Sequence, residues 1–349
     1  MKLPFPIAQV GAGAVLTLSE NPKDKVRITS LAAAGAAVYN VILYLVPALG
    51  FPPILPIPFA DFSSVIEKLL PGAALGITTD LTILATGFII PLDVVISLFI
   101  SSFAVYFIGN HLLVVQQAFT EWSPGMGTFL AYQRSTLHFW FYLQIGIGLA
   151  LGIMPLILRH DVLVQGLKSL VSKPEGVAAG ELPSIKVLLL LYLSGAAGLI
   201  IMIWRLTNFP VLYLVALIIG WVFVSSNIST LMLGSSGLSV DVPYIKHATI
   251  YLSGETDIRI WFTGFNGLLG DAPYSGAGGA GMSQMFKVAE LSSTKLSDVI
   301  KGLIIASALG WLMAIPYAAI LWKIAPIPSS LYPAVNLFWP IPIILNGIW

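Results

Sequence analysis

Apolar runs of about 20 residues recur along this chain with almost no charge inside them, and they constrain its fold more than any other feature. A helix of about 20 apolar residues is long enough to cross the roughly 30 Å hydrocarbon core of a membrane. Of the 349 residues, 57% are hydrophobic and 9% are charged, whereas an ordinary soluble domain carries roughly 25% charged residues. The sequence therefore predicts an all-α polytopic membrane protein.

The runs predict seven or eight transmembrane helices within a single integral membrane domain, residues 1–349. Clear spans are expected at residues 28–49, 71–89, 91–113, 138–158, 187–204, 209–225 and 302–322. The short sequence RLTN between two of these spans indicates a helical hairpin. Segments rich in Gly or Pro are expected to be broken or re-entrant, and they cover residues 1–18, 258–284 and 331–349.

Lys and Arg residues are distributed unevenly over this predicted topology. If residues 71–89 cross the membrane, the side that holds the N-terminus carries most of the 17 basic residues. The other side carries Lys68, Arg134, Arg205 and Lys323. Because short cytoplasmic loops are enriched in Lys and Arg, we expect a multi-pass protein of the cell membrane with a cytoplasmic N-terminus.

Several classes of function are disfavoured by the residues that the sequence lacks. The net charge is +1, and no cluster of basic residues marks a nucleic-acid surface. The absence of Cys excludes disulfides and thiolate metal sites within this chain. The four His residues show no metal-site spacing, and neither a GxxxxGK[ST] phosphate loop nor a GxSxG serine elbow occurs. We therefore expect no cofactor, no metal site and no nucleic-acid partner.

Two carboxylates, Asp80 and Asp93, stand inside the apolar stretch at residues 70–114. An acidic side chain at the bilayer centre costs roughly 2.5–3.5 kcal/mol on insertion scales, so it is retained mainly where it faces a cavity or a partner. Gly and Pro residues around the two carboxylates indicate a broken helix pair, which is a sequence sign of a transporter's binding site. Asp80, directly after Thr79, is expected well inside its span and to act in ion or substrate coupling. Asp93 follows Pro91 and is explained more simply as a helix cap.

A glycine-rich tract, DAPYSGAGGAGMSQ at residues 271–284, is the second candidate for a pathway. Glycine lets the backbone approach a ligand closely, so we expect this tract to line the route of a solute. The candidate contacts are Asp271, Tyr274, Gly278, Gly279 and Gln284. Nearby charges are typical either of an ion-pair network along a pathway or of a solvated loop, and they include Glu255, Asp257 and Arg259.

The apolar stretch that contains Asp80, the glycine-rich tract and the N-terminus together resemble the oligopeptide transporter superfamily, which includes the yellow-stripe-like carriers of metal chelates. The resemblance rests on LPGAALGITTDLTILATGFIIPLDVVISLF at residues 70–99, on APYSGAGGAGMSQMFKVAEL at residues 272–291, and on LPFP near the N-terminus. It implies a proton- or cation-coupled secondary transporter, a symporter for small peptides or peptide-like metal chelates, with a fold of two related halves. This chain would correspond to the later, C-terminal part, either as a fragment, as one half that pairs with a second, or as a homodimer.

Two other interpretations of the sequence stay open beside a transporter. A membrane-embedded enzyme would use Asp80 and Asp93 as a general acid and base pair. A non-catalytic scaffold subunit would need neither carboxylate except for assembly. The expected partners of a transporter are the lipid bilayer, a small peptide or chelate substrate, and a coupling proton or cation.

Overall fold

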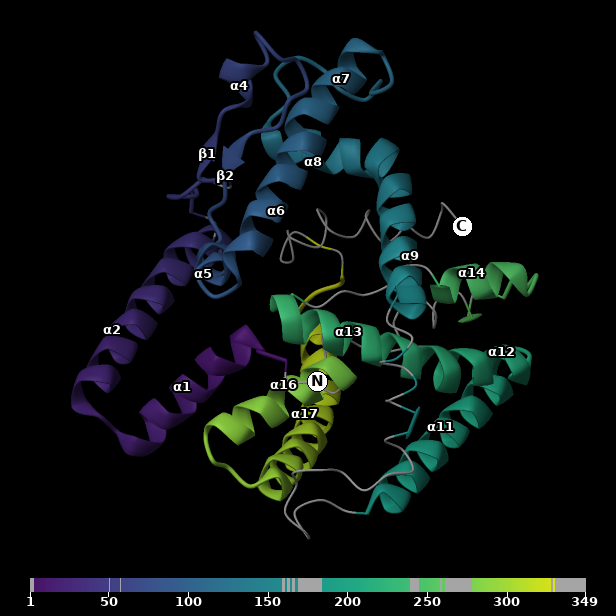
Figure 1. Ribbon diagram of the computed structural model, residues 1–349. Helices are drawn as coiled ribbons and strands as arrows, with labels where there is room; N and C mark the ends of the chain where they lie inside the picture. Colours follow the sequence, from purple (N-terminus) through teal and green to yellow (C-terminus); the bar gives the residue numbers. More distant parts are fainter. Residues whose placement is uncertain are drawn as a thin grey trace. The chain divides into compact units, whose positions relative to one another are not determined.

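The computed structural model describes residues 3–49, 51–56, 58–158, 161, 164, 167–168, 184–238, 245–257, 259–260, 278–327 and 329. Helices dominate these residues, and the sheet among them has two short strands (Figure 1). In this part of the chain five helices are long and apolar enough to cross a membrane: Lys23–Leu45, Leu92–Val115, Ile185–Thr207, Val211–Ser236 and Leu296–Ile324. The predicted all-α membrane architecture is confirmed at this level, and the count of seven or eight spans stays a prediction.

The chain divides into two compact units. The first unit comprises residues Met1–His160, Asn227–Pro243 and Gly279–Val288. The second unit comprises residues Asp161–Ser226, Tyr244–Gly278 and Ala289–Trp349.

The first unit begins with two helices, α1 (Pro6–Glu20) and α2 (Lys23–Asn40). Pro6 suits the start of α1 because its fixed φ matches the helix and its missing N–H would have no helical partner. The two helices meet at Asn21, whose φ of 51° lies in the left-handed region that Asn tolerates. α2 continues through a π-helical turn, η1 (Val41–Leu45), into α3 (Val46–Ala48).

Residues 71–89 do not form the continuous span that the sequence predicted. Instead, β1 (Ala60–Asp61) pairs antiparallel with β2 (Gly76–Ile77), with α4 (Ser63–Ile66) between them in the chain. Helix returns only at α5 (Leu81–Gly87), which is seven residues long. Gly72 explains part of the break, because its φ of 84° is a conformation that other residues rarely adopt. The predicted cytoplasmic N-terminus assumed a crossing here, so the orientation stays a prediction.

A long helical run follows, made of α6 (Leu92–Ser102), η2 (Phe103–Gly109) and α7 (Asn110–Val115), and it covers the span predicted at residues 91–113. At the end of η2 the Asn110 N–H donates to the carbonyl of Val105, five residues earlier instead of four. The Tyr106 carbonyl therefore does not accept from the Asn110 N–H, its usual helical donor. It accepts instead from the Ala74 N–H at 3.0 Å. The π-helical turn therefore ties the broken segment to the middle of this run.

The next helical run packs closely against the previous one. It consists of α8 (Thr128–Ser135), η3 (Thr136–Trp140) and α9 (Phe141–Leu158), so helix covers the range predicted at residues 138–158. A Cβ placed on Gly109 would lie 2.7 Å from Cζ2 of Trp140, so this contact requires glycine. The Trp140 indole N–H donates to Oδ1 of the buried Asn110 at 2.6 Å.

In the second unit, α11 (Ile185–Thr207) and the run of α12 (Val211–Val215) and η4 (Ala216–Trp221) form the predicted hairpin. The run continues as α13 (Val222–Ser236), whose residues from Asn227 onward belong to the first unit. Asn208, with a φ of 56°, ends α11, and its N–H donates to the Trp204 carbonyl at 2.7 Å. The Tyr192 hydroxyl joins the two arms by donating to the Ile218 carbonyl at 3.1 Å. A buried apolar cluster centred on Ile203, Phe209 and Leu214 stabilises the hairpin.

The remaining described helices are α14 (Ile245–Leu252), α16 (Gly279–Leu291) and α17 (Leu296–Ile324). α17 contains the span predicted at residues 302–322, and its 29 residues rise by about 44 Å at 1.5 Å per residue. Its described residues include no buried side chain, and Trp311 is 80% exposed. A helix that is apolar on all sides is suited to a lipid environment.

Candidate functional site

A pocket of about 830 Å³ lies within the first unit, in the size range of roughly 300–1,000 Å³ that is typical of small-molecule sites. Its lining comes from η1, from the broken segment at residues 74–83, from α6 and η2, and from the start of α8. Ser102 and Phe103 line it at the middle of the helical run Leu92–Val115. The pocket therefore lies at mid-span relative to this helical run.

Asp80 lines this pocket and also caps α5. Its Oδ1 accepts a hydrogen bond from the Thr82 N–H at 2.7 Å, so the carboxylate occupies the N-cap position. Among the described residues that line the pocket, Asp80 is the only one with a charged side chain. The expectation that Asp80 lies well inside a span is wrong, because it begins a short helix.

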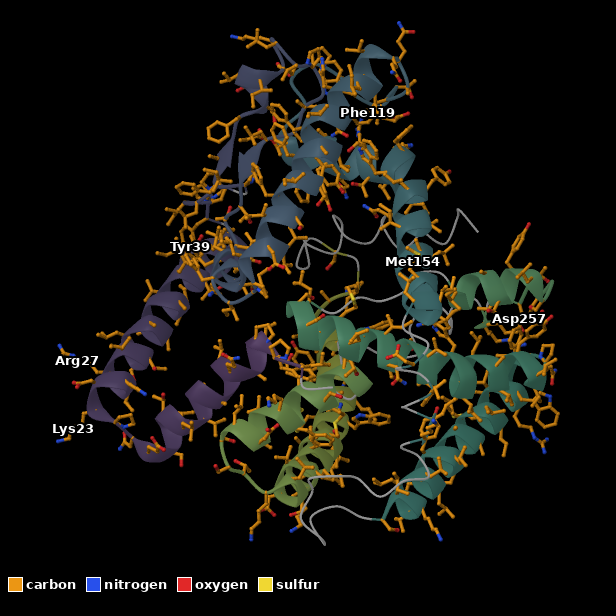
Figure 2. The ribbon with its side chains drawn as sticks, in the orientation of Figure 1. Lys23, Arg27, Tyr39, Phe119, Met154 and Asp257 are labelled. Carbon is orange, nitrogen blue, oxygen red and sulfur yellow. The ribbon has the colours of Figure 1, made fainter. Side chains whose placement is uncertain are left out.

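Hydrogen bonds fix the backbone that carries the Asp80 carboxylate. The buried Thr79 hydroxyl donates to the Pro56 carbonyl at 2.8 Å, and the Tyr39 hydroxyl donates to the Thr79 carbonyl at 2.6 Å. The Asp80 N–H donates to the Thr78 hydroxyl at 3.1 Å. Figure 2 shows Tyr39 at the far end of α2 from Lys23 and Arg27, which places this anchor at the uncharged end of the helix.

Asp93 is not the cap that the sequence predicted. The N-cap position of α6 is Pro91, which makes no side-chain cap bond, and Asp93 lies in the first helical turn. It is exposed and is not among the residues that line the pocket. Phe103 follows ten residues later, about 15 Å along the helix axis at 1.5 Å per residue. Asp93 therefore meets the positive end of the α6 dipole, as expected, but does not cap the helix, whereas Asp80 caps α5.

Asp61 joins Ser63 to Thr128, a residue that lines the pocket, through hydrogen bonds. Sequence reasoning missed Asp61. Its Oδ1 accepts from the Ser63 N–H at 2.9 Å, from the Ser63 hydroxyl and from the Thr128 hydroxyl at 2.7 Å. Its Oδ2 accepts from the Thr128 N–H at 2.8 Å, at the start of α8. We call these three residues the Asp61 clasp. The spacing Asp-x-Ser indicates the local bond, but no local signal reveals Thr128, which lies 67 residues away.

The pKa of Asp61 is lowered despite an opposing contribution from burial. Partial burial raises the pKa because it disfavours the charged form, while hydrogen bonds from Ser63 and Thr128 lower it by a larger total. The carboxylate is therefore held ionised at neutral pH. In this form it accepts from every donor in the Asp61 clasp.

The glycine-rich tract is described only in part. Asp271 and Tyr274 lie outside the described residues. Gly278 and Gly279 precede and begin α16, and Gln284 lies within that helix. These last three residues are not among the described residues that line the pocket. Their predicted contact with a solute stays a prediction.

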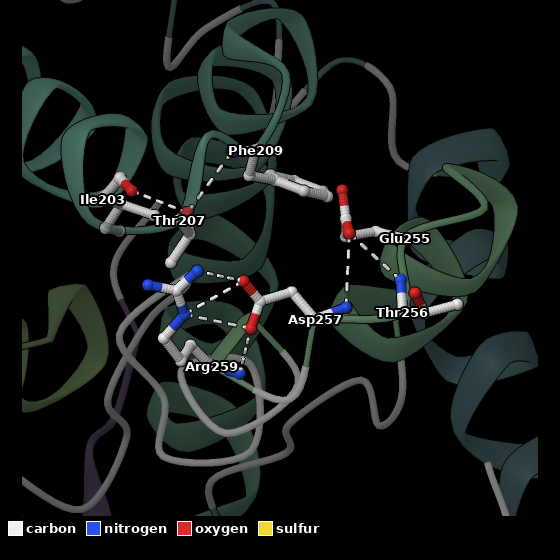
Figure 3. A network of polar contacts seen from close by, with 7 residues as sticks. All are labelled: Ile203, Thr207, Phe209, Glu255, Thr256, Asp257 and Arg259. Atoms are coloured by element: carbon white, nitrogen blue, oxygen red, sulfur yellow. Dashed lines mark hydrogen bonds and ion pairs between the residues drawn. The ribbon is translucent and has the colours of Figure 1, made fainter.

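In the second unit, Asp257 and Arg259 form an ion pair (Figure 3). Arg259 Nη2 lies 2.5 Å from Asp257 Oδ2, and hydrogen bonds from Arg259 lower the pKa of Asp257. The guanidinium side chain is 64% exposed. The Asp257 side chain is 22% exposed, so the pair is only partly exposed, and the choice between a solvated loop and an ion-pair network along a pathway stays a prediction.

No family model, curated protein or solved structure matches this chain. The resemblance to the oligopeptide transporter superfamily therefore stays a prediction from the segments quoted above. Among the described residues, no group of three His, Asp or Glu side chains gathers as a metal site.

Proposed function

We propose that this chain is a secondary active transporter, or one half of one, that moves a small solute through the pocket of the first unit. Asp80 couples this movement to a proton or another cation. The observation that carries the proposal is the Asp80 carboxylate, fixed by hydrogen bonds and the one charged group among the described lining residues, in a pocket at the middle of an apolar helical run. The substrate class that the sequence resemblance favours is a small peptide or a peptide-like metal chelate.

The broken backbone around Asp80 supports this proposal. Non-helical backbone at membrane depth is tolerated where it lines a cavity, because its polar groups need partners other than lipid. Residues 74–80 line the pocket without forming helix, and the short helix α5 follows them. Transporters form solute sites near the bilayer midplane from discontinuous helices of this kind.

The transporter is proposed to lie in the cell membrane with its N-terminus in the cytoplasm, and to pair with a second half or a second copy. An enzyme that uses Asp80 and Asp93 gains no support from the pocket, because Asp93 is not among the described residues that line it. The scaffold alternative predicts that neither carboxylate affects uptake. The experiment below separates both alternatives from the transporter.

Uptake of radiolabelled trialanine into proteoliposomes, driven by an imposed proton gradient, tests the proposal. Asp80→Asn is the informative variant because Asn caps a helix about as well as Asp, so it removes the charge and keeps the bond from Thr82. We expect gradient-driven uptake to be lost in this variant. The matched control is Asp93→Asn, which removes an exposed carboxylate outside the pocket lining and should keep uptake. Normal uptake by Asp80→Asn would refute the proposed role.

A further inference from the structure

The lining of the pocket combines one negative charge with many aromatic rings. Three tyrosines contribute to it: Tyr44, Tyr106 and Tyr132. Four phenylalanines contribute as well: Phe99, Phe103, Phe107 and Phe129. Among the described lining residues, no Lys, Arg or His side chain offsets the charge of Asp80. The faces of aromatic rings attract cations, and aromatic sites are the common way in which proteins bind quaternary ammonium groups.

The rings are held in place by one another. The Phe103 and Phe107 rings stack with centroids 4.6 Å apart and an interplanar angle of 16°. Tyr106 and Tyr132 come from different helical runs, and their ring centroids are 4.7 Å apart. The Tyr106 hydroxyl oxygen accepts a hydrogen bond from Gln144 Nε2 at 3.3 Å. Because several contacts fix these rings, a ligand would lose little binding energy in ordering them.

The charge of the pocket separates the classes of ligand. An anion would face the Asp80 carboxylate, and no described lining residue carries a positive charge to attract it. A neutral solute would displace water from a half-buried carboxylate without pairing it, and an unpaired charge is costly to desolvate. A cation would supply the missing partner. A carboxylate has about four lone-pair sites, so Asp80 can accept from the Thr82 N–H and still face a ligand.

We propose that the pocket binds the ammonium group of a small organic cation, with Asp80 as its counter-ion and aromatic side chains around its apolar part. The proposal rests on the proposed function, since it names the substrate class of the same site. The free amino terminus of a peptide carries such a group. An amino compound without any peptide bond carries it as well.

Equilibrium binding to the full chain in lipid nanodiscs tests the charge requirement with three compounds of one shape. Choline carries the ammonium group, 3,3-dimethylbutan-1-ol has carbon in place of the nitrogen, and 3,3-dimethylbutanoate carries a negative charge. We expect choline to bind at least about tenfold more tightly than the alcohol. We expect the butanoate to bind more weakly than the alcohol. Equal binding of choline and the alcohol, or no binding of choline, would overturn the proposal.

Two variants in the pocket and one control variant outside it assign the preference to the residues of the pocket. Asp80→Asn should reduce the ratio of choline to alcohol affinity to about threefold or less, while Asp93→Asn should leave it unchanged. Phe107→Leu keeps apolar volume but removes a ring, so choline affinity should fall about two- to fivefold while alcohol affinity stays the same. Size-exclusion profiles and melting temperatures of the variants check their folding. A ratio unchanged in the folded Asp80→Asn protein would overturn the proposal.

The binding experiment tests the ammonium site and the uptake experiment tests the transporter, so either proposal can be refuted without the other. Trialanine uptake that depends on Asp80, combined with no preference for choline, would refute the ammonium site and keep the transporter. A preference for choline that depends on Asp80, without gradient-driven uptake, would keep the ammonium site and refute the transporter.

Discussion

The Asp61 clasp gives the most detailed prediction about the integrity of the pocket. In Asp61→Asn, one carboxylate oxygen becomes an NH₂ group that can only donate. Both oxygens of Asp61 accept from donors, with Ser63 and the Thr128 hydroxyl on Oδ1 and the Thr128 N–H on Oδ2. Either orientation of the amide therefore loses an acceptor and brings two donors together. The Thr128→Val variant removes only the hydroxyl and keeps the shape of the side chain.

The expected loss of stability is modest because Asp61 is exposed. Hydrogen bonds to charged groups contribute roughly 1.5–3 kcal/mol where they are buried. Solvent screening reduces this at an exposed carboxylate, so we expect Asp61→Asn to lower the free energy of unfolding by about 1 kcal/mol. The apparent melting temperature should then fall by about 2–4 °C. Choline affinity should fall as well, because the clasp holds Thr128, which lines the pocket.

The difference in melting temperature between the wild type and Asp61→Asn should become smaller as the pH falls. The folded pKa of Asp61 lies below its usual value, so the carboxylate contributes its full stabilisation above about pH 4. That stabilisation is lost as the pH falls through the lowered folded pKa. The melting temperatures of the wild type and Asp61→Asn should therefore converge as the protein is acidified from neutral pH.

Thermal unfolding followed by circular dichroism, over a series of pH values, measures both effects. Glu121→Gln serves as the control, since it neutralises an exposed carboxylate of the same unit outside the Asp61 clasp. This control should match the wild type at every pH. Equal melting temperatures of Asp61→Asn and the wild type at neutral pH would refute the clasp. A difference that does not shrink on acidification would refute the role of the charge.

Three further changes test the packing and the surface charges. Trp140→Phe leaves Asn110 Oδ1 buried without its indole donor and should cost about 1–3 kcal/mol in thermal unfolding; an unchanged melting temperature would contradict this bond. Gly109→Ala places a Cβ 2.7 Å from the Trp140 ring and should cost about 1–3 kcal/mol; the double variant with Trp140→Phe should cost less than the sum of the two. Arg259→Gln breaks the partly exposed pair with Asp257 and should leave the melting temperature unchanged at high salt; a large loss there would show that the pair is structural.

Features that depend on neighbouring residues could be predicted from the sequence. The hairpin at Thr207 and Asn208 follows from two apolar runs and a short polar turn, and α17 follows from a single apolar run. The break before Asp80 was harder to locate. Average hydropathy is the same for a helix and for an apolar loop, so the composition of residues 71–89 did not reveal the turn at Gly72.

The candidate site likewise combines features that the sequence reveals with features that it does not. Asp80 could be selected from its charge and its apolar surroundings, but which of Asp80 and Asp93 caps a helix depends on where each helix begins. The Asp61–Thr128 bonds join residues far apart in the chain, and a single sequence contains no signal for them. The link from Ala74 to Tyr106 depends on a π-helical turn within an apolar run. Nothing in the residue pattern distinguishes that turn from ordinary helix.

The most direct test of a solute pathway at mid-span uses single cysteines, because the chain contains none. Ser102 lines the pocket, whereas Ile100, two residues earlier in α6, is 60% exposed and is not among the residues that line it. In proteoliposomes, Ser102→Cys should react with a small membrane-impermeant methanethiosulfonate at least about tenfold faster than Ile100→Cys, because thiolate forms in water and not in lipid. Choline should slow that reaction. Equal rates at the two positions would contradict a water-accessible pathway through this pocket.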